Sequence, residues 1–93
     1  MAVALSPSLD MKPKKIRLFG KTWCSWCQDA AAWLDQRGYA YEKIDIGQTP
    51  AARDEMIKLS NQNLVPVIEV DGQVLADFDT AQLEIFWKKH GFE

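Results

Sequence analysis

Both cysteines of this chain, Cys24 and Cys27, lie inside the segment 21–27 with two residues between them. A short apolar run over 16–20 precedes them, and a helical pattern begins at about Ser25. A helix that starts there puts Cys24 at its N-terminus and Cys27 one turn later on the same face, with Cβ atoms roughly 5–6 Å apart. That separation allows a reversible disulfide after small adjustments. Two thiols in this setting are typical of a dithiol redox site.

The two thiols are predicted to have different roles. The unpaired N–H groups and the positive dipole end of the helix favour the thiolate form of Cys24. We therefore expect Cys24 to attack and Cys27 to resolve the adduct. A static disulfide or a pair of inert core thiols is the alternative, but closing so short a loop adds little stability. A zinc site is disfavoured, because one chain supplies only this pair and a distant His90.

The composition is that of one small domain. The chain has 93 residues, with 11 basic and 13 acidic side chains and a net charge of −2. This balance argues against a nucleic-acid partner, and no segment resembles a membrane span or a signal peptide. Cysteine usage of this kind is typical of a cytosolic redox pair. We expect a cytoplasmic monomer with a flexible tail over 1–13 and one domain over 14–93.

Strand and helix patterns alternate along that domain. We expect strands at 16–19, 39–46, 64–70 and 73–76, and helices at 25–37, 51–59 and about 79–90. Local signals mark the ends of these elements: Gly38, Thr49-Pro50, Asp71-Gly72, Asp79 or Thr80, and Gly91. The helix residues expected to face inward are Ala30, Ala31, Trp33, Leu34, Ala52, Met56, Leu59, Leu83, Phe86 and Trp87.

The resulting order is β-α-β-α-β-β-α. Sequential βαβ units favour parallel strands, and the hairpin adds an antiparallel strand at one side. The pattern therefore predicts an α/β protein with a thioredoxin-like fold, in which a small mixed four-stranded sheet is flanked by three helices.

From about Lys15 to Gly91 the chain resembles the glutaredoxin family. Three features carry the resemblance in the right order: Cys24-Ser25-Trp26-Cys27 after Lys21, Val65-Pro66 at the third strand, and Asp77-Phe78-Asp79 before the last helix. Segment 51–58 also resembles the second helix of bacterial glutaredoxins. The resemblance implies a glutathione-linked thiol–disulfide oxidoreductase that reduces protein disulfides or glutathione mixed disulfides, with no tightly bound cofactor.

The resemblance also implies a glutathione site. Its residues would be Lys21, Trp26, Arg53, Val65, Pro66, Asp79 and Thr80. The bond before Pro66 would be cis, and the Val65 backbone would pair with the cysteinyl part of glutathione like an added strand. Lys21 and Arg53 would hold the glycine carboxylate, and the helix start at Asp79 would hold the γ-glutamyl end. The alternatives are surface charges at Lys21 and Arg53, a simple cap at Asp79, and Trp26 packed on the sheet edge.

Several positions depart from the family pattern. Where glutaredoxins usually have Gly-Gly-x-Asp-Asp, this chain has residues 76–80 with Ala76 and Asp77 in place of both glycines. Leu64 replaces the usual threonine before Val65-Pro66. Added side chains and one negative charge should weaken glutathione binding. This leaves open a redoxin recharged by a thioredoxin-reductase-type flavoprotein. Ser25 replaces the proline that usually follows the first cysteine of the family motif. This replacement also leaves open a dimer that holds a [2Fe–2S] cluster through Cys24 of each chain and two glutathiones.

Overall fold

The computed structural model describes residues 12–93, so the tail expected over 1–13 lies outside the described residues except for its last two. Seven elements follow one another in the predicted order. They are β1 (Ile16–Gly20), α1 (Ser25–Gln36), β2 (Glu42–Asp45), α2 (Pro50–Ser60), β3 (Val67–Val70), β4 (Gln73–Ala76) and α3 (Thr80–Lys89). No helix in this part of the chain is long and apolar enough to cross a membrane.

The four strands form one mixed sheet in the order β2-β1-β3-β4. β1 pairs with β2 in parallel, whereas the pairs β1–β3 and β3–β4 are antiparallel. The expectation of parallel strands is thus correct for the first βαβ unit and wrong for the second. The reason is that α2 and the loop after it return the chain to the sheet edge where β2 ends, so β3 runs back against β1.

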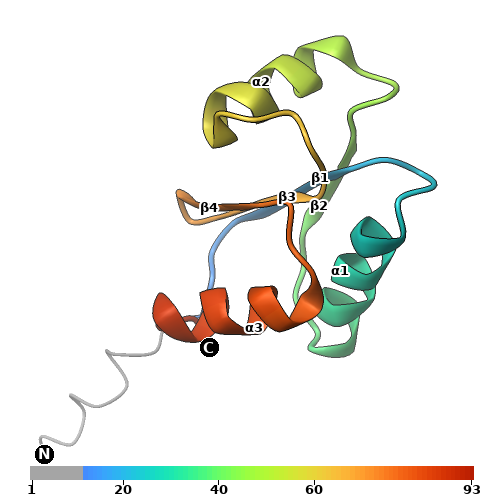
Figure 1. The fold of residues 1–93 in the computed structure, drawn as a ribbon. Helices are drawn as coiled ribbons and strands as arrows, with labels where there is room; N and C mark the ends of the chain where they lie inside the picture. Colours follow the sequence, from blue (N-terminus) through green and yellow to red (C-terminus); the bar gives the residue numbers. More distant parts are fainter. Residues whose placement is uncertain (1–11) are drawn as a thin grey trace, which may run out of the picture.

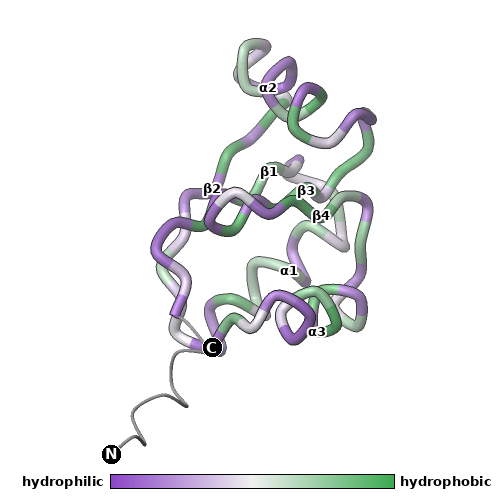
Figure 2. The backbone as a smooth tube through the Cα atoms, turned by 90° about the vertical axis from the view of Figure 1, so that its left-hand side faces the viewer, coloured by the Kyte–Doolittle hydropathy of each residue, from purple (hydrophilic) through white to green (hydrophobic). Residues whose placement is uncertain are grey.

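Helices cover both faces of the sheet. Figure 1 shows α1 and α3 packed on one face and α2 alone on the other. In Figure 2 hydrophobic residues lie along β1 and β3, in the middle of the molecule. Every residue expected to face inward from α1 and α3 is buried, but in α2 only Met56 is, while Ala52 and Leu59 are half-buried. α2 is therefore the least deeply anchored helix.

An ion cluster adds to the attachment of α2. Arg17 of β1 donates from Nε to Glu69 of β3 at 2.7 Å, and its Nη1 lies 2.8 Å from a Glu55 oxygen on α2. The Arg17 guanidinium also lies over the Phe19 ring, 5.2 Å from its centroid. Charge-assisted bonds of this kind link the helix to two strands of the sheet.

Both α1 and α3 end as their glycines predict. After α1, Gly38 has φ of 75°, its N–H donates to Asp35 and the Tyr39 N–H donates to the Leu34 carbonyl. This is the Schellman pattern, in which a left-handed glycine satisfies the last carbonyls of a helix. The same arrangement follows α3, where Gly91 has φ of 70° and the Phe92 N–H donates to Trp87.

The helix starts agree less completely with the sequence. α2 begins at Pro50 as expected, but the side chain of Thr49 makes no capping hydrogen bond, which corrects that prediction. α3 begins after Asp79, whose carboxylate accepts from the Gln82 N–H at 2.9 Å while the Gln82 side chain accepts from the Asp79 N–H at 3.0 Å. This reciprocal capping box fixes where α3 starts.

Two strands are shorter than predicted. The segment 39–46 is a strand only over Glu42–Asp45, because the Tyr39 N–H is used at the end of α1 and its ring packs on Trp33 and Trp87. The segment 64–70 is a strand only over Val67–Val70. The backbone of Leu64 forms hydrogen bonds with the Gln62 side chain, and Pro66 has no N–H to donate to a neighbouring strand.

Candidate active site

Three segments leave the sheet at the same edge. Phe19 pairs with Val67, and Val67 pairs with Ala76, so β1 ends where β3 begins and β4 ends. The loops 21–24, 64–66 and 77–79 therefore join the sheet side by side. The Asp77 N–H donates to the Pro66 carbonyl at 2.8 Å and ties two of these loops together. All three sequence features that carry the family resemblance meet at this edge.

The two cysteines lie at the start of α1. Cys24 is the N-cap residue, its sulfur accepts the Cys27 N–H at 3.1 Å, and the two sulfurs are joined in a disulfide with Cα atoms 5.2 Å apart. Cys24 is partly exposed, whereas Cys27 is only 4% exposed. A reagent in solvent therefore reaches Cys24 more readily than Cys27, and the disulfide can open and close within one helical turn.

Gly20 lies directly against the side chain of Cys27. A Cβ atom placed on Gly20 would lie 2.9 Å from the Cys27 sulfur and 3.0 Å from its Cβ. The last residue of β1 thus has to be glycine for Cys27 to pack against the strand. Sequence reasoning missed this residue, and its only signal there is a glycine placed directly before the Lys21–Cys24 loop.

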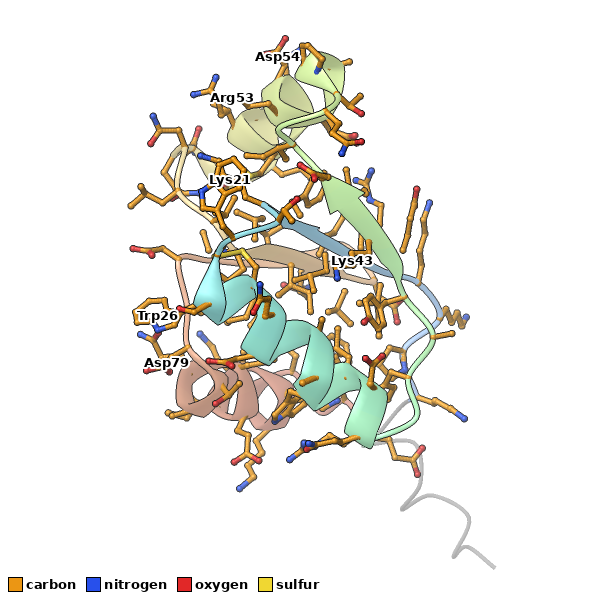
Figure 3. All side chains as sticks on the ribbon, turned by 90° about the vertical axis from the view of Figure 1, so that its right-hand side faces the viewer. Lys21, Trp26, Lys43, Arg53, Asp54 and Asp79 are labelled. Carbon is orange, nitrogen blue, oxygen red and sulfur yellow. A yellow bond between two sulfur atoms is a disulfide. The ribbon has the colours of Figure 1, made fainter. Side chains whose placement is uncertain are left out.

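The two basic residues expected to bind glutathione come from different elements. Lys21 comes from the loop after β1 and Arg53 from α2, and Figure 3 shows both side chains on the same side of the molecule, above the disulfide. Both are exposed. Neither is in an ion pair within residues 12–93, so both are available to an anion.

The Val65–Pro66 peptide bond is cis, which confirms the prediction made from the resemblance. Val65 is partly buried and Pro66 is buried, directly before β3. Asp79 caps α3 and Thr80 is its first residue, so the simple capping role of Asp79 is present whatever else the residue does. The segment between β4 and α3 brings Asp79 to the same side as Trp26 in Figure 3.

Asp77 stands where the resemblance predicts a glycine, and it adopts a glycine-like backbone. Its φ is 53°, in the left-handed region, and its side chain is exposed. Aspartate tolerates this region better than most residues. The next residue, Phe78, is buried in the core. The replacement of glycine thus keeps the path of the chain and adds a free carboxylate beside the site.

Three large apolar side chains on the segments that form the site are exposed to solvent. Trp23 is 81% exposed, Trp26 is 44% exposed and Leu64 is 54% exposed. Trp26 is therefore only partly packed, and the alternative that it packs on the sheet edge does not account for its exposed part. Trp23 makes almost no packing contacts. Exposed aromatic rings beside a reactive sulfur provide contact area for another molecule.

A side pocket of about 350 Å³ opens between α1, β1 and β2. It reaches Cys27 and is lined by Leu18, Gly20, Lys21, Thr22, Cys27, Gln28, Lys43, Ile44 and Asp45. The Asp45 carboxylate accepts from the Thr22 hydroxyl at 3.0 Å and from the Gly47 N–H at 2.7 Å. No cluster of three or more His, Cys, Asp or Glu residues that could hold a metal ion occurs in residues 12–93.

Known proteins share both the sequence and the fold. The glutaredoxin family model matches residues 16–75. Glutaredoxin 3 of Escherichia coli is 33% identical over 64 residues, which are 69% of this chain and 77% of that protein. A glutaredoxin-like 8.6 kDa protein from the rubredoxin operon of Clostridium pasteurianum is 28% identical over 69 residues, 74% of this chain and 92% of that protein.

The fold is thioredoxin-like, as predicted. A mutant of the thioredoxin-like protein BC3987 superposes with a TM-score of 0.71 at 27% identity, covering 76% of this chain and 96% of that chain. The site has the matching chemistry, a Cys-x-x-Cys redox disulfide at the start of α1. The family model, the relatives and the site agree, and the chain belongs to the glutaredoxin family.

Proposed function

We propose that this protein reduces disulfides by thiol–disulfide exchange, with Cys24 as the nucleophile and Cys27 as the resolving thiol. The Cys24 thiolate attacks a substrate disulfide, and one half of the substrate leaves as a thiolate. Cys27 then attacks the Cys24 sulfur, forms the Cys24–Cys27 disulfide and releases the second half. An external thiol returns the protein to its dithiol form.

One observation carries this assignment. Cys24 caps α1 and is partly exposed, while Cys27 is buried against Gly20. The helix start supplies an N–H donor and a positive dipole end to the Cys24 sulfur, and the same groups stabilise a thiolate there. Only the outer sulfur combines access with this stabilisation.

Single-cysteine variants test the assignment. Cys24→Ser is expected to abolish disulfide reduction, whereas Cys27→Ser should accumulate a mixed disulfide with the substrate. Reaction of each variant with iodoacetamide near neutral pH gives the order of reactivity directly. Faster alkylation of Cys27 than of Cys24 would reverse the roles.

Glutathione is the proposed small-molecule thiol. It would lie along Lys21, Trp26, Arg53, Val65, Pro66, Asp79 and Thr80. Support comes from the shared sheet edge, from the Lys21 and Arg53 side chains, which form no ion pair within residues 12–93, and from the helix start at Asp79. Protein disulfides and glutathionylated proteins are the corresponding substrates, and the exposed Trp23 and Trp26 rings offer them contact area.

Titration of glutathione into Cys27→Ser protein, followed by NMR, tests this site. Chemical-shift changes should concentrate on Lys21, Arg53, Val65 and Asp79. Changes confined to residues far from these four would rule out the proposed position.

A second electron donor is favoured by a specific observation. Asp77 places an exposed carboxylate beside the proposed γ-glutamyl position, where it repels the carboxylate of glutathione. One unfavourable contact of about 1.4 kcal/mol weakens affinity tenfold. The protein would then accept electrons from a thioredoxin-reductase-type flavoprotein. A coupled NADPH assay with glutathione and glutathione reductase, run beside one with thioredoxin reductase, distinguishes the two donors.

The [2Fe–2S] alternative also involves Cys24, one from each of two chains with two glutathiones. The partly exposed position of Cys24 suits such a shared ligand. Anaerobic purification is the test: a brown protein of dimeric mass supports the cluster, and a colourless monomer that reduces glutathionylated substrates supports the oxidoreductase.

A further inference from the structure

We propose that Asp45 accepts the proton of Cys27 during the resolving step, through the side pocket between α1 and β2. The inference rests on the proposed function, because it concerns the second half of that exchange reaction. Cys27 needs such a group. It is buried, and a free thiol with a pKa of about 8.5 is mostly protonated at neutral pH, whereas the thiolate is the reactive form.

Strand register places Asp45 beside Cys27. Asp45 is the direct partner of Gly20 in the parallel β1–β2 ladder. Side chains of directly paired residues point to the same face of a sheet, and neighbouring strands lie about 4.8 Å apart. The Cys27 sulfur lies 2.9 Å from the position that a Gly20 Cβ would occupy. The Asp45 side chain and the Cys27 sulfur therefore lie on the same face of the sheet, the face covered by α1, over two paired residues of neighbouring strands.

The pocket joins the two groups. Both Cys27 and Asp45 line it, and its volume of about 350 Å³ leaves ample room for water between them. A proton can thus pass from the sulfur to the carboxylate through water in the pocket. Cys24 does not line this pocket. The pocket therefore serves the buried thiol and not the outer one.

Hydrogen bonds hold the Asp45 carboxylate in place and leave it able to accept a further hydrogen bond or a proton. Its two oxygens accept one hydrogen bond each, from the Thr22 hydroxyl and from the Gly47 N–H. A carboxylate has about four acceptor sites, so two remain. The Gln28 side chain donates to the Thr22 carbonyl at 2.9 Å, which fixes the same loop to α1. These bonds orient the carboxylate before any substrate arrives.

The charged neighbours in the pocket are cations. Lys21 comes from the loop after β1 and Lys43 from β2, while α1 contributes only Cys27 and the neutral Gln28. Two lysines favour a thiolate on Cys27 after the proton has moved. The pocket is thus suited to the charge that develops in the resolving step.

The step balances as follows. The Asp45 carboxylate takes the proton of Cys27, and the Cys27 thiolate attacks the Cys24 sulfur of the mixed disulfide. The Cys24–Cys27 bond forms, the bond from Cys24 to the substrate breaks, and the substrate leaves as a thiolate. Asp45 then returns the proton to solvent. The substrate disulfide gains two electrons in the complete exchange, and the dithiol loses them.

Stopped-flow reaction of the reduced full chain with 5,5′-dithiobis(2-nitrobenzoate) separates the two halves. The first release of coloured thiol reports attack by Cys24 and depends on reagent concentration. The second release reports resolution by Cys27 and does not. Asp45→Asn is the key variant, because its amide matches the carboxylate in shape and can still bond to both Gly47 and Thr22 while losing the ability to take a proton. Thr22→Val is the matched control, since it removes one hydrogen bond to Asp45 but keeps the carboxylate.

We expect the second phase of the wild type to change by much less than tenfold per pH unit from about pH 5.5 to 8, because the base is internal. In Asp45→Asn the second phase should be at least about tenfold slower at pH 6 and should rise tenfold per pH unit, since hydroxide then removes the proton. Thr22→Val should keep the shallow wild-type slope even if its rate differs. Equal slopes in the wild type and Asp45→Asn would overturn the role of Asp45. A missing first phase in the wild type would instead overturn the proposed function.

Discussion

Gly20→Ala is expected to destabilise the protein by displacing Cys27. The added methyl group would lie 2.9 Å from the Cys27 sulfur and 3.0 Å from its Cβ, whereas carbon atoms normally pack about 3.5–4.0 Å apart. Gly20 does not have a positive φ, so the effect arises from this contact and not from backbone strain. Neither neighbour can retreat easily, because Cys27 is buried and its backbone belongs to α1.

The magnitude follows from that overlap. Overpacking a well-packed site costs about 1–3 kcal/mol. For a domain of this size, each kcal/mol lowers the melting temperature by about 4–8 °C. We therefore expect Tm to fall by about 4–24 °C in thermal unfolding followed by circular dichroism under reducing conditions.

A double-mutant cycle separates this contact from other effects of the substitution. Cys27→Ala removes the sulfur, so adding Gly20→Ala to it should cost less than adding Gly20→Ala to the wild type. Part of the cost should remain, because the Cβ of residue 27 still lies in the way. The same loss of Tm in both backgrounds would refute the packing argument.

Three other substitutions test different parts of the structure. Arg17→Met should lower the free energy of unfolding by about 1–3 kcal/mol in urea titrations, because it leaves the half-buried Glu69 carboxylate unpaired; an unchanged midpoint would contradict this. Burial and a hydrogen bond to Asp35 raise the pKa of Tyr41 above its usual 10.0, so the stability linked to the neutral phenol is complete below pH 10 and is lost as pH rises through the raised pKa. Tyr41→Phe should therefore flatten the decline of Tm above pH 10, and an equally steep decline would show that this phenol is not responsible. Asp77→Gly should tighten glutathione binding in calorimetric titrations and also raise stability by up to about 1 kcal/mol, because glycine tolerates φ of 53°; unchanged affinity would remove the charge explanation.

Local chemistry explains which elements could be predicted from the sequence. A helix start depends on a few adjacent residues, so the structure confirms Cys24 at the start of α1 and, of the two candidates Asp79 and Thr80, selects Asp79 as the cap of α3. A helix end with a left-handed glycine is equally local, as Gly38 and Gly91 show. The buried faces of α1 and α3 followed from spacing alone, because a helix has one period whatever it packs against.

The errors at β2 and β3 occur where distant segments decide the local structure. The strand predicted over 39–46 lost its first residues to the end of α1 and to the aromatic packing of Tyr39. The capping bond expected from Thr49 is absent, although the residue occupies the capping position. The predicted direction of β3 is wrong, because β3 runs antiparallel to β1. The path of α2 across the sheet decides where β3 begins, and the hydrophobic pattern of α2 does not encode that path.

By itself, the sequence determined the order of elements, the disulfide at the start of α1 and the residues that carry the family motif, because each depends on neighbours within a few positions. Only the tertiary structure decided what surrounds the buried thiol. Gly20 touches Cys27 across the face of β1, and Asp45 reaches the same pocket because β2 pairs with β1 in one particular register. No spacing along the chain encodes these contacts, since strand register is set by packing of the whole sheet.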